Sequence, residues 1–547
     1  MTEFEHRAKG MRQRVVVAER TASSWRRSVA WQDILTRAIV AWFPLALALG
    51  LGGFLRLWAI NSVGYNSDEA VYAGQAAALA NDPELASRFP IFRAHPMLFQ
   101  SILSVFFHFG VHDVVGRLLS VAFGMATIYL VYRLGYVLYG KGTGEVAALI
   151  VAVMPYHVVV TRQVLLDGPM TFFSTLALLM TASFAVTSRP AYLYASGAAM
   201  GLTFMSKETG FIMVAGIYAF LALTPQITVR LRDLVITGAC IFATIVAHPL
   251  SVALAGRTST AQGYLIWQLF RRPNHNLTFY PSVVPQAIGW AVIALAGLGL
   301  LVLWRERTWR EKLLIAWILV PVAMFELWPV KGFQYLLPIA PALAVLAART
   351  LMRWLPVVAV QSQRRRIWTS TMRILAISIV LLTLVIPSWD RVQPPHSGQL
   401  LAGSGGMPGG REAGKWIQNH VPEDAIFLTV GPSMANIIAF YGHREAYGLS
   451  VSPNPLHRNP SYKAISNPDT EIRYSELQYL VWDSFSGTRS PFFAQKLKIY
   501  ADRYHGHEVH RESVNVRQPD GTIKAEPVII IYQVRGNVSS SQSTGNQ

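Results

Sequence analysis

The sequence predicts a polytopic α-helical membrane protein with an α/β domain at its C-terminal end. Of its 547 residues, 52% are hydrophobic and only 14% are charged. A soluble protein carries about 25% charged residues. Several apolar runs also exceed the roughly 18 residues that a helix needs to cross a bilayer. These observations exclude a cytosolic enzyme, a disordered chain and a fibrous protein.

The apolar runs predict about eleven membrane spans. They cover residues 38–60, 114–138, 144–161, 168–187, 191–206, 209–224, 233–252, 283–304, 313–329, 333–351 and 368–388. We interpret 191–224 as two short spans that turn at Lys207, because both flanks of this stretch are basic. Residues 96–111 favour a helix in the outer interface, because the run is short for a full crossing.

The positive charge of the chain predicts its orientation in the membrane. The net charge is +18, and almost all of it lies in residues 1–390. Lys and Arg are kept in cytoplasmic loops, so topology explains this charge more simply than a nucleic-acid partner does. We therefore expect a cytoplasmic N-terminus, an extracytoplasmic C-terminus, a location in the plasma membrane and no nucleic-acid partner.

Composition divides the chain into five parts. They are a cytoplasmic tail at 1–37, a transmembrane domain at 38–390 with a first outer loop at 61–113, a linker at 391–410, an extracytoplasmic α/β domain at 411–536 and a disordered tail at 537–547. Within the α/β domain, the residue patterns predict strands at 425–430, 478–482 and 528–534. Cys240 is the single cysteine, which excludes an intrachain disulfide.

Two adjacent carboxylates, Asp68 and Glu69, follow the first predicted span. Ser67 can cap the helix that begins there, and acidic residues in a first turn suit the helix dipole, so capping alone can explain them. A functional interpretation also fits, because a carboxylate at the outer membrane surface can take a proton from an incoming hydroxyl. Spacing alone does not choose between the two.

Asp167 stands at the start of a later predicted span, where it can serve as an N-cap. The predicted topology places it on the same side as Asp68. Other polar groups predicted on that side are Lys207, Lys331, Tyr335, Arg117, His95, Arg271, Arg272, Asn274 and His275. Carboxylates beside cations at the outer leaflet suit a reaction between an anionic lipid donor and a hydroxyl or amine acceptor.

Other classes of function remain open at this point. The chain has no Walker A, GxGxxG or CxxC motif, so ATP, NAD and thiolate–zinc chemistry lack support. A transporter or flippase is an alternative, although such proteins place their charged sites near the bilayer midplane and often have repeated halves. A non-catalytic scaffold with an outer binding domain is a further alternative, and it needs no cluster of acids and bases.

The order of these motifs resembles the protein mannosyltransferase-like family of GT-C glycosyltransferases, glycosyltransferase family 39 and its aminoarabinose transferase relatives. The resemblance covers residues 35–350 and rests on Asp68-Glu69, His95-Pro96, Arg117, the run from Arg162 to Pro169, Gly201–Gly210 with Lys207, and the run from Lys331 through Tyr335 to Pro338. The family often has His-Pro-Pro where this chain has His95-Pro96-Met97. No β-trefoil insert of the eukaryotic mannosyltransferases is visible, which favours a bacterial or archaeal relative.

The resemblance implies a GT-C fold and an enzyme of the extracytoplasmic face. Such an enzyme transfers a sugar, mannose or a related one, with inversion, from a polyprenyl-phosphate-linked donor to a protein, lipid or glycan acceptor. It is surrounded by membrane lipids.

The resemblance also implies roles for particular residues. Asp68 corresponds to the general base, Glu69 to its acidic neighbour and Asp167 to a second acid that positions the acceptor or supports the site. Lys207, Lys331 and Tyr335 correspond to groups near the lipid phosphate, with Arg117 a weaker candidate. His95, Tyr72 and His275 correspond to groups that line the site. His275 is also a candidate ligand for a divalent metal, the one cofactor that the sequence leaves open.

Overall fold

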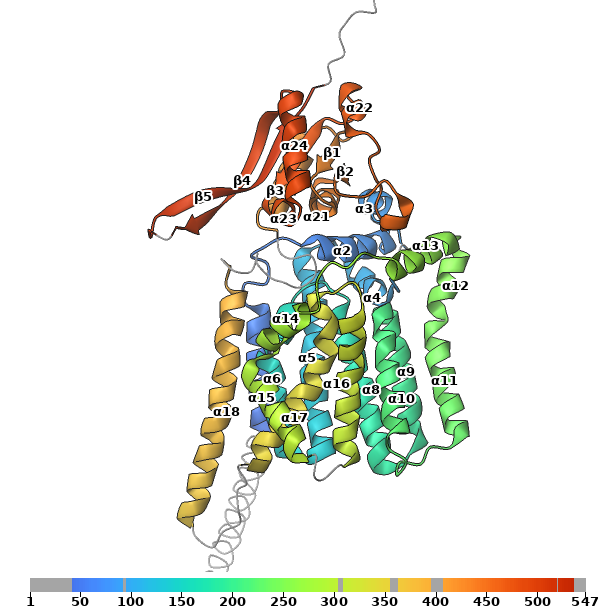
Figure 1. Cartoon of the computed structure of the whole chain (residues 1–547), viewed down its shortest axis with the longest axis vertical. Helices are drawn as coiled ribbons and strands as arrows, with labels where there is room; N and C mark the ends of the chain where they lie inside the picture. Colours follow the sequence, from blue (N-terminus) through green and yellow to red (C-terminus); the bar gives the residue numbers. More distant parts are fainter. Residues whose placement is uncertain are drawn as a thin grey trace, which may run out of the picture.

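The computed structural model describes residues 42–91, 95–303, 308–354, 363–394, 407–518 and 520–535. A bundle of long helices carries a smaller α/β domain at one end, and α2 (Ser67–Leu79) lies across that end, between the two parts (Figure 1). The predicted tails at 1–37 and 537–547, and most of the predicted linker at 391–410, lie outside the described residues.

The predicted apolar runs form helices wherever the structure describes them. They are Trp42–Leu57, α5 (Asp113–Tyr139), α6 (Lys141–Val153), α7 (Pro155–Val160), α8 (Asp167–Thr187), α9 (Pro190–Ser206), η1 (Glu208–Phe211), α10 (Ile212–Ala222), α11 (Leu231–Ile245), α12 (Ala247–Leu254), α14 (Phe279–Ile288), α15 (Trp290–Leu303), α16 (Trp309–Leu327), η2 (Phe333–Ile339), α17 (Ala340–Trp354) and α18 (Gln363–Val392). Among the described residues, five helices are long and apolar enough to cross a membrane, or six if the bent pair α14–α15 is one span. The protein is therefore a multi-pass membrane protein, while the count of eleven spans and the orientation stay predictions.

Two runs that were predicted as continuous spans are broken. The first divides at Met154, directly before Pro155, into α6 and α7. The second bends by 99° at Gly289, whose φ of +101° lies in the region that favours glycine. The chain also breaks at Lys207, where a turn was predicted, because its extended backbone, with φ of −161°, separates α9 from η1.

Residues 61–113, the predicted first outer loop, form short helices next to the α/β domain (Figure 1). They are α2, α3 (Pro83–Arg88) and α4 (Leu98–Phe107), and a further outer segment forms α13 (Thr258–Leu269). The ten residues of α4 are too few for a crossing, and this helix packs against α2. The structure agrees here with a helix at the interface rather than a span.

The C-terminal domain is a mixed α/β domain, as predicted. Its elements are α20 (Gly410–His420), β1 (Ile426–Thr429), α21 (Pro432–Ile437), η3 (Ile438–Gly442), β2 (Glu445–Gly448), η4 (Pro455–His457), α22 (Pro468–Arg473), β3 (Tyr479–Asp483), α23 (Ser484–Arg489), α24 (Pro491–Arg503), β4 (His507–Arg517) and β5 (Ile523–Gln533). The sheet order is β2-β1-β3-β5-β4, in which β1 is parallel to β2 and β3, and β5 is antiparallel to both of its neighbours.

The first outer loop and the C-terminal domain share one hydrophobic core. On one side, the face of α2 buries small side chains such as Ala70 and Ala73, and Phe89 joins them from the end of α3. On the other side, α21 and η3 contribute Ile437 and Phe440. Because β1 leads directly into α21, the carboxyl end of this strand faces α2.

Candidate active site

Asp68 lies in the first turn of α2, where a capping box fixes the start of the helix. The side chain of Asn66 accepts a hydrogen bond from the backbone of Glu69 at 3.0 Å, and the Glu69 carboxylate accepts one from the backbone of Asn66, also at 3.0 Å. The cap is therefore Asn66, and the prediction of Ser67 was wrong by one residue. Glu69 is used in this cap, while Asp68 is not part of it.

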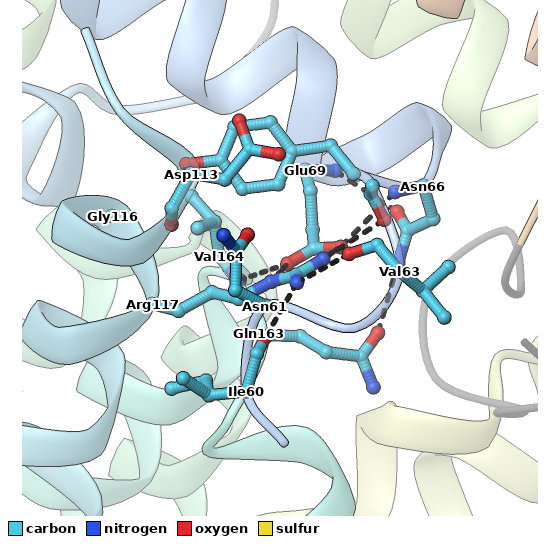
Figure 2. A network of polar contacts seen from close by, with 12 residues as sticks. Ile60, Asn61, Val63, Asn66, Glu69, Asp113, Gly116, Arg117, Gln163 and Val164 are labelled. Atoms are coloured by element: carbon cyan, nitrogen blue, oxygen red, sulfur yellow. Dashed lines mark hydrogen bonds and ion pairs between the residues drawn. The ribbon is translucent and has the colours of Figure 1, made fainter. Parts of the chain in front are cut away.

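Glu69 and Arg117 form a buried pair (Figure 2). The Nε and Nη2 groups of Arg117 donate to the two carboxylate oxygens of Glu69, each at 2.9 Å. The guanidinium also donates to the carbonyl oxygens of Ile60, Val63 and Gly64 at 2.7 to 2.9 Å. These bonds occupy both side chains, so their contacts favour a structural role that fixes the segment before Asp68. They do not favour the predicted contact of Arg117 with a donor phosphate.

Asp167 and Lys207 form a second buried ion pair. The ammonium of Lys207 lies 2.8 and 3.0 Å from the two carboxylate oxygens of Asp167, and both residues are at most 4% exposed. The same ammonium lies 4.6 Å from the centre of the Tyr335 ring. The structure thus brings three predicted site residues together from α8, the α9–η1 turn and η2. The side chain of Asp167 makes no capping hydrogen bond, so capping does not explain this residue.

Asp68 interacts electrostatically with this pair. Burial raises the pKa of Asp68 above its ordinary value, and the Asp167 carboxylate raises it further. The positive charge of Lys207 opposes these effects, as do His95 and Arg489 to a smaller extent. A carboxyl group with a raised pKa is better matched to taking a proton near neutral pH than an ordinary aspartate is.

His95 and Tyr72 lie on the same side of the site as Asp68. The Nδ1 atom of His95 is 2.7 Å from the Glu208 carboxylate, and the His95 ring meets the ring of Tyr72 edge-on at 6.0 Å. Tyr264 of α13 donates to Glu208 at 3.4 Å and packs against His95 at 5.6 Å. The predicted lining residues His95 and Tyr72 are therefore neighbours, and two further residues join them.

Lys331 is directed elsewhere. Its ammonium donates to the carbonyl oxygens of Phe325, Glu326 and Trp328, at the end of α16. A lysine that satisfies the last carbonyls of a helix acts as a C-terminal cap. Asn274, also from the predicted cluster, holds the backbone of Lys331 through two hydrogen bonds of 2.8 and 2.9 Å. These contacts give Lys331 a structural role, and they do not place it on a donor phosphate.

His275 stacks on Phe279 with ring centres 4.0 Å apart. Across the part of the chain that the structure describes, no group of three or more His, Cys, Asp or Glu side chains gathers as a metal site requires. The structure therefore gives His275 no set of fellow ligands, and the possibility of a divalent metal stays an untested expectation.

The sequence did not single out Glu208, Tyr264 or Arg489. Glu208 had a local signal, because it stands beside Lys207 in an otherwise apolar stretch. No local sequence pattern marks Arg489, because only the tertiary fold brings α23 near the site. Its guanidinium is exposed, lies 4.3 Å from the ring centre of Phe485 and interacts electrostatically with Asp68 and His275.

Sequence comparison matches part of this chain to known proteins. Residues 94–252 match the family described as dolichyl-phosphate-mannose-protein mannosyltransferase. The undecaprenyl phosphate-alpha-4-amino-4-deoxy-L-arabinose arabinosyl transferase of Serratia proteamaculans (strain 568) is 32% identical over 167 residues. That alignment spans 28% of this chain and 29% of the relative.

Structural comparison covers most of the chain. ArnT from Cupriavidus metallidurans bound to undecaprenyl phosphate has a TM-score of 0.62 at 14% identity, over 90% of this chain and 97% of that one. The apo oligosaccharyltransferase of Archaeoglobus fulgidus has a TM-score of 0.57 at 14% identity, over 89% of this chain and 74% of that one. At these identities the likeness shows the fold. Together with the sequence matches over part of the chain, it agrees with the resemblance drawn from the motifs: the chain is a membrane protein with the GT-C fold of these structures, and residues 94–252 are similar to the protein mannosyltransferase family.

Proposed function

We propose that this protein is an inverting glycosyltransferase. It moves a sugar from a polyprenyl-phosphate-linked donor to a hydroxyl or amine of a protein, lipid or glycan acceptor. The observation that carries this proposal is the buried Asp167–Lys207 pair together with Asp68, whose carboxyl group interacts electrostatically with both members of the pair. These residues lie where the apolar helix bundle meets a polar domain (Figure 1). The names of the relatives support it, because one is an arabinosyl transferase named for an undecaprenyl phosphate sugar and another has undecaprenyl phosphate bound.

Asp68 acts as the general base in the proposed reaction. Its carboxylate takes the proton of the acceptor hydroxyl as that oxygen bonds to the anomeric carbon. The bond between the anomeric carbon and the phosphate oxygen breaks, and the polyprenyl phosphate leaves with the electron pair. An attack from the face opposite the phosphate inverts the configuration of the sugar.

Lys207 supplies positive charge where the phosphate leaves. An ammonium has three N–H donors, and two acceptor oxygens of Asp167 lie within hydrogen-bond distance, which leaves a donor for a phosphate oxygen. Asp167 acts here as a positioning residue, because it holds the ammonium in place. Tyr335 covers the other side of the ammonium.

The site is proposed to face the extracytoplasmic side of the plasma membrane of a bacterium or an archaeon. The start of α8 and the end of α9 carry Asp167 and Lys207 at the same end of the bundle as the C-terminal domain (Figure 1). The Lys and Arg bias of the loops assigns this end to the outside. A transporter would place its charged groups near the midplane of the bilayer. Asp167 and Lys207 instead lie at the ends of their helices.

A direct transfer assay tests the proposed function. The purified protein in liposomes receives labelled polyprenyl-phosphate pentoses and hexoses, including 4-amino-4-deoxyarabinose and mannose, with membrane extract as the source of acceptor. We expect wild type to move label from one of these donors, and Asp68→Asn to move it at least about a hundredfold more slowly. A parallel sample with EDTA tests the divalent metal, since activity that is lost and then restored by Mg²⁺ would assign one. If wild type consumes none of these donors, the proposed function is contradicted for these sugars.

The Arg489→Gln variant is expected to shift the pH dependence of transfer. The positive charge of Arg489 favours the carboxylate form of Asp68, so its removal raises the pKa of Asp68. The base works when deprotonated, and activity therefore rises with pH through that pKa. We expect the acidic limb of the kcat/KM profile to move to higher pH, and only slightly, because the charge is exposed and partly screened.

Arg503→Gln provides the matched control for this shift. Arg503 is an arginine of α24 in the same domain, and it pairs with Asp469 rather than with Asp68. Its removal is expected to leave the acidic limb in place. A limb that moves to lower pH in Arg489→Gln, or by the same amount in both variants, contradicts the assignment.

A further inference from the structure

The segment 61–66 lies in the connection between the first helix, which ends at Leu57, and α2, and it ends directly before the residue pair Ser67-Asp68. It has no regular helix or strand. From the membrane side, Arg117 binds the carbonyl oxygens of Val63 and Gly64 within it. The opposite side of the segment lies against the C-terminal domain, more than 300 residues later in the chain. The position of Asp68 thus depends on two distant parts of the protein.

Tyr441 of η3 is the main contact from the C-terminal domain. Its hydroxyl accepts a hydrogen bond from the backbone N–H of Tyr65 at 2.7 Å and donates one to the Asp113 carboxylate at 2.5 Å. Tyr65 closes the arrangement, because its own hydroxyl donates to the backbone carbonyl of Asp113 at 3.1 Å. Both tyrosines are buried. Burial and the nearby Asp113 raise the pKa of Tyr441, so its hydroxyl keeps the proton that it donates.

The contact is also close in space. A Cβ atom on Gly64 would lie 2.5 Å from the Cβ of Arg411 and 3.3 Å from the Tyr441 hydroxyl, so only glycine fits at this position without a shift. Arg411 donates to the side chain and the backbone of Asn61 at 2.8 and 3.1 Å. The domain therefore packs directly on the segment, with no room for a larger residue between them.

A second contact from the C-terminal domain holds Ser67, two residues after Tyr65 in the chain. The amide of Asn436 in α21 donates to the hydroxyl of Ser67 at 2.9 Å. Ser67 is the residue immediately before Asp68. Together with the shared core of α2, α21 and η3, these bonds hold the start of α2 from the side of the domain.

We propose that the C-terminal domain contributes to the active site by holding the segment before Asp68. Tyr441 is the positioning residue in this contact, because its hydrogen bonds fix the position of Asp68. The catalytic half of this inference rests on the proposed function. A free segment of this length samples many conformations, and a displacement of about 1 Å at a reacting group can cost about a hundredfold in rate. The domain restricts the segment to one of these conformations. This role explains why a domain without a recognisable motif is attached to the enzyme.

Tyr441→Phe tests the proposal, with Tyr504→Phe as the matched control. Tyr504 is also buried, and its hydroxyl also donates one hydrogen bond and accepts one. Its partners are the backbone carbonyl of Asp469 and the Nε group of Arg473, both in α22. Both variants are compared by hydrogen–deuterium exchange of peptides that cover residues 61–69, and by kcat and KM for the sugar donor.

We expect the Tyr441→Phe variant to exchange about tenfold faster in residues 61–69, because one buried hydrogen bond is lost there. Its kcat falls about tenfold and its donor KM stays within about twofold, since the donor itself is not touched. Tyr504→Phe shows neither change. If Tyr441→Phe folds poorly, Asn436→Ala takes its place, because it changes a half-buried residue and is milder. We expect this variant to exchange faster in residues 61–69 and to have a lower kcat.

Three results separate the possible failures. Exchange in residues 61–69 that is equal in Tyr441→Phe and Tyr504→Phe overturns the proposal. Faster exchange with an unchanged kcat overturns the catalytic half, because the segment is then held without effect on the reaction. If wild type transfers no sugar, the proposed function fails, and the exchange data still decide whether Tyr441 holds the segment.

Discussion

Asp68→Asn is expected to lower the rate of sugar transfer about a hundredfold or more. Asparagine has nearly the same shape, but it cannot accept the proton of the acceptor. Removal of a positioned general base typically costs 10²- to 10⁴-fold. Asp68 takes no part in the capping box of α2, so the start of the helix keeps its cap in the variant. The measurement is the initial rate of transfer at saturating donor, together with the thermal unfolding midpoint.

Asp82→Asn is the matched control for this prediction. Asp82 lies in the same outer loop and caps α3 by accepting hydrogen bonds from Glu84 and Leu85. Asparagine is an equally good N-cap, so this variant should keep both its activity and its stability. Full activity in Asp68→Asn would contradict the assignment of the base, whereas equal losses in both variants would indicate that the loop as a whole is sensitive.

Arg117→Met is expected to cause the largest loss of stability. It leaves the Glu69 carboxylate buried without its partner, and it removes the hydrogen bonds to three carbonyl oxygens before Asp68. Breaking a buried pair by removing one member typically costs about 3–5 kcal/mol. A lower unfolding midpoint in detergent and a lower yield of folded protein are the expected results.

A double variant separates the charge effect from the loss of packing. In Glu69→Met/Arg117→Met no buried charge is left alone, so its destabilisation should be smaller than the sum of the two single losses. Additive losses would show that the two side chains act independently. An Arg117→Met protein as stable as wild type would contradict the role of this pair in fixing the segment before Asp68.

The membrane part of the fold could be predicted because length and apolarity decide it. Each predicted run forms a helix where it is described, since a segment in lipid must satisfy its backbone groups internally. The breaks at Met154 and Gly289 were missed, although Pro155 and the glycine itself were visible signals. The apolar runs continue across both breaks, and each run was therefore predicted as one continuous span. In the C-terminal domain, β4 (His507–Arg517) was missed because this edge strand is rich in charged residues.

The roles of the charged residues were harder to predict than their location. The pairing of Asp167 with Lys207 depends on where two helix ends meet, and the predicted topology already placed those ends on one side. Lys331 and Arg117 were expected to lie near a phosphate. Instead, the ammonium of Lys331 and the guanidinium of Arg117 each donate hydrogen bonds to backbone carbonyl oxygens. Their partners are set by chain breaks and loop paths that no local pattern records. Arg489 is the extreme case, because only the docking of the domain brings it to the site.

The core that α2 shares with the C-terminal domain also bears on how the protein is made. About 330 residues separate the end of α2 at Leu79 from the start of α20 at Gly410. At roughly 5–20 residues per second, a ribosome needs about 20–60 s to synthesise them. During that time the alanine face of α2 lacks the side chains that later cover it. A chain that terminates before α20 therefore holds the described helices of the bundle but an unfinished catalytic centre, so a domain made after the bundle completes the enzyme.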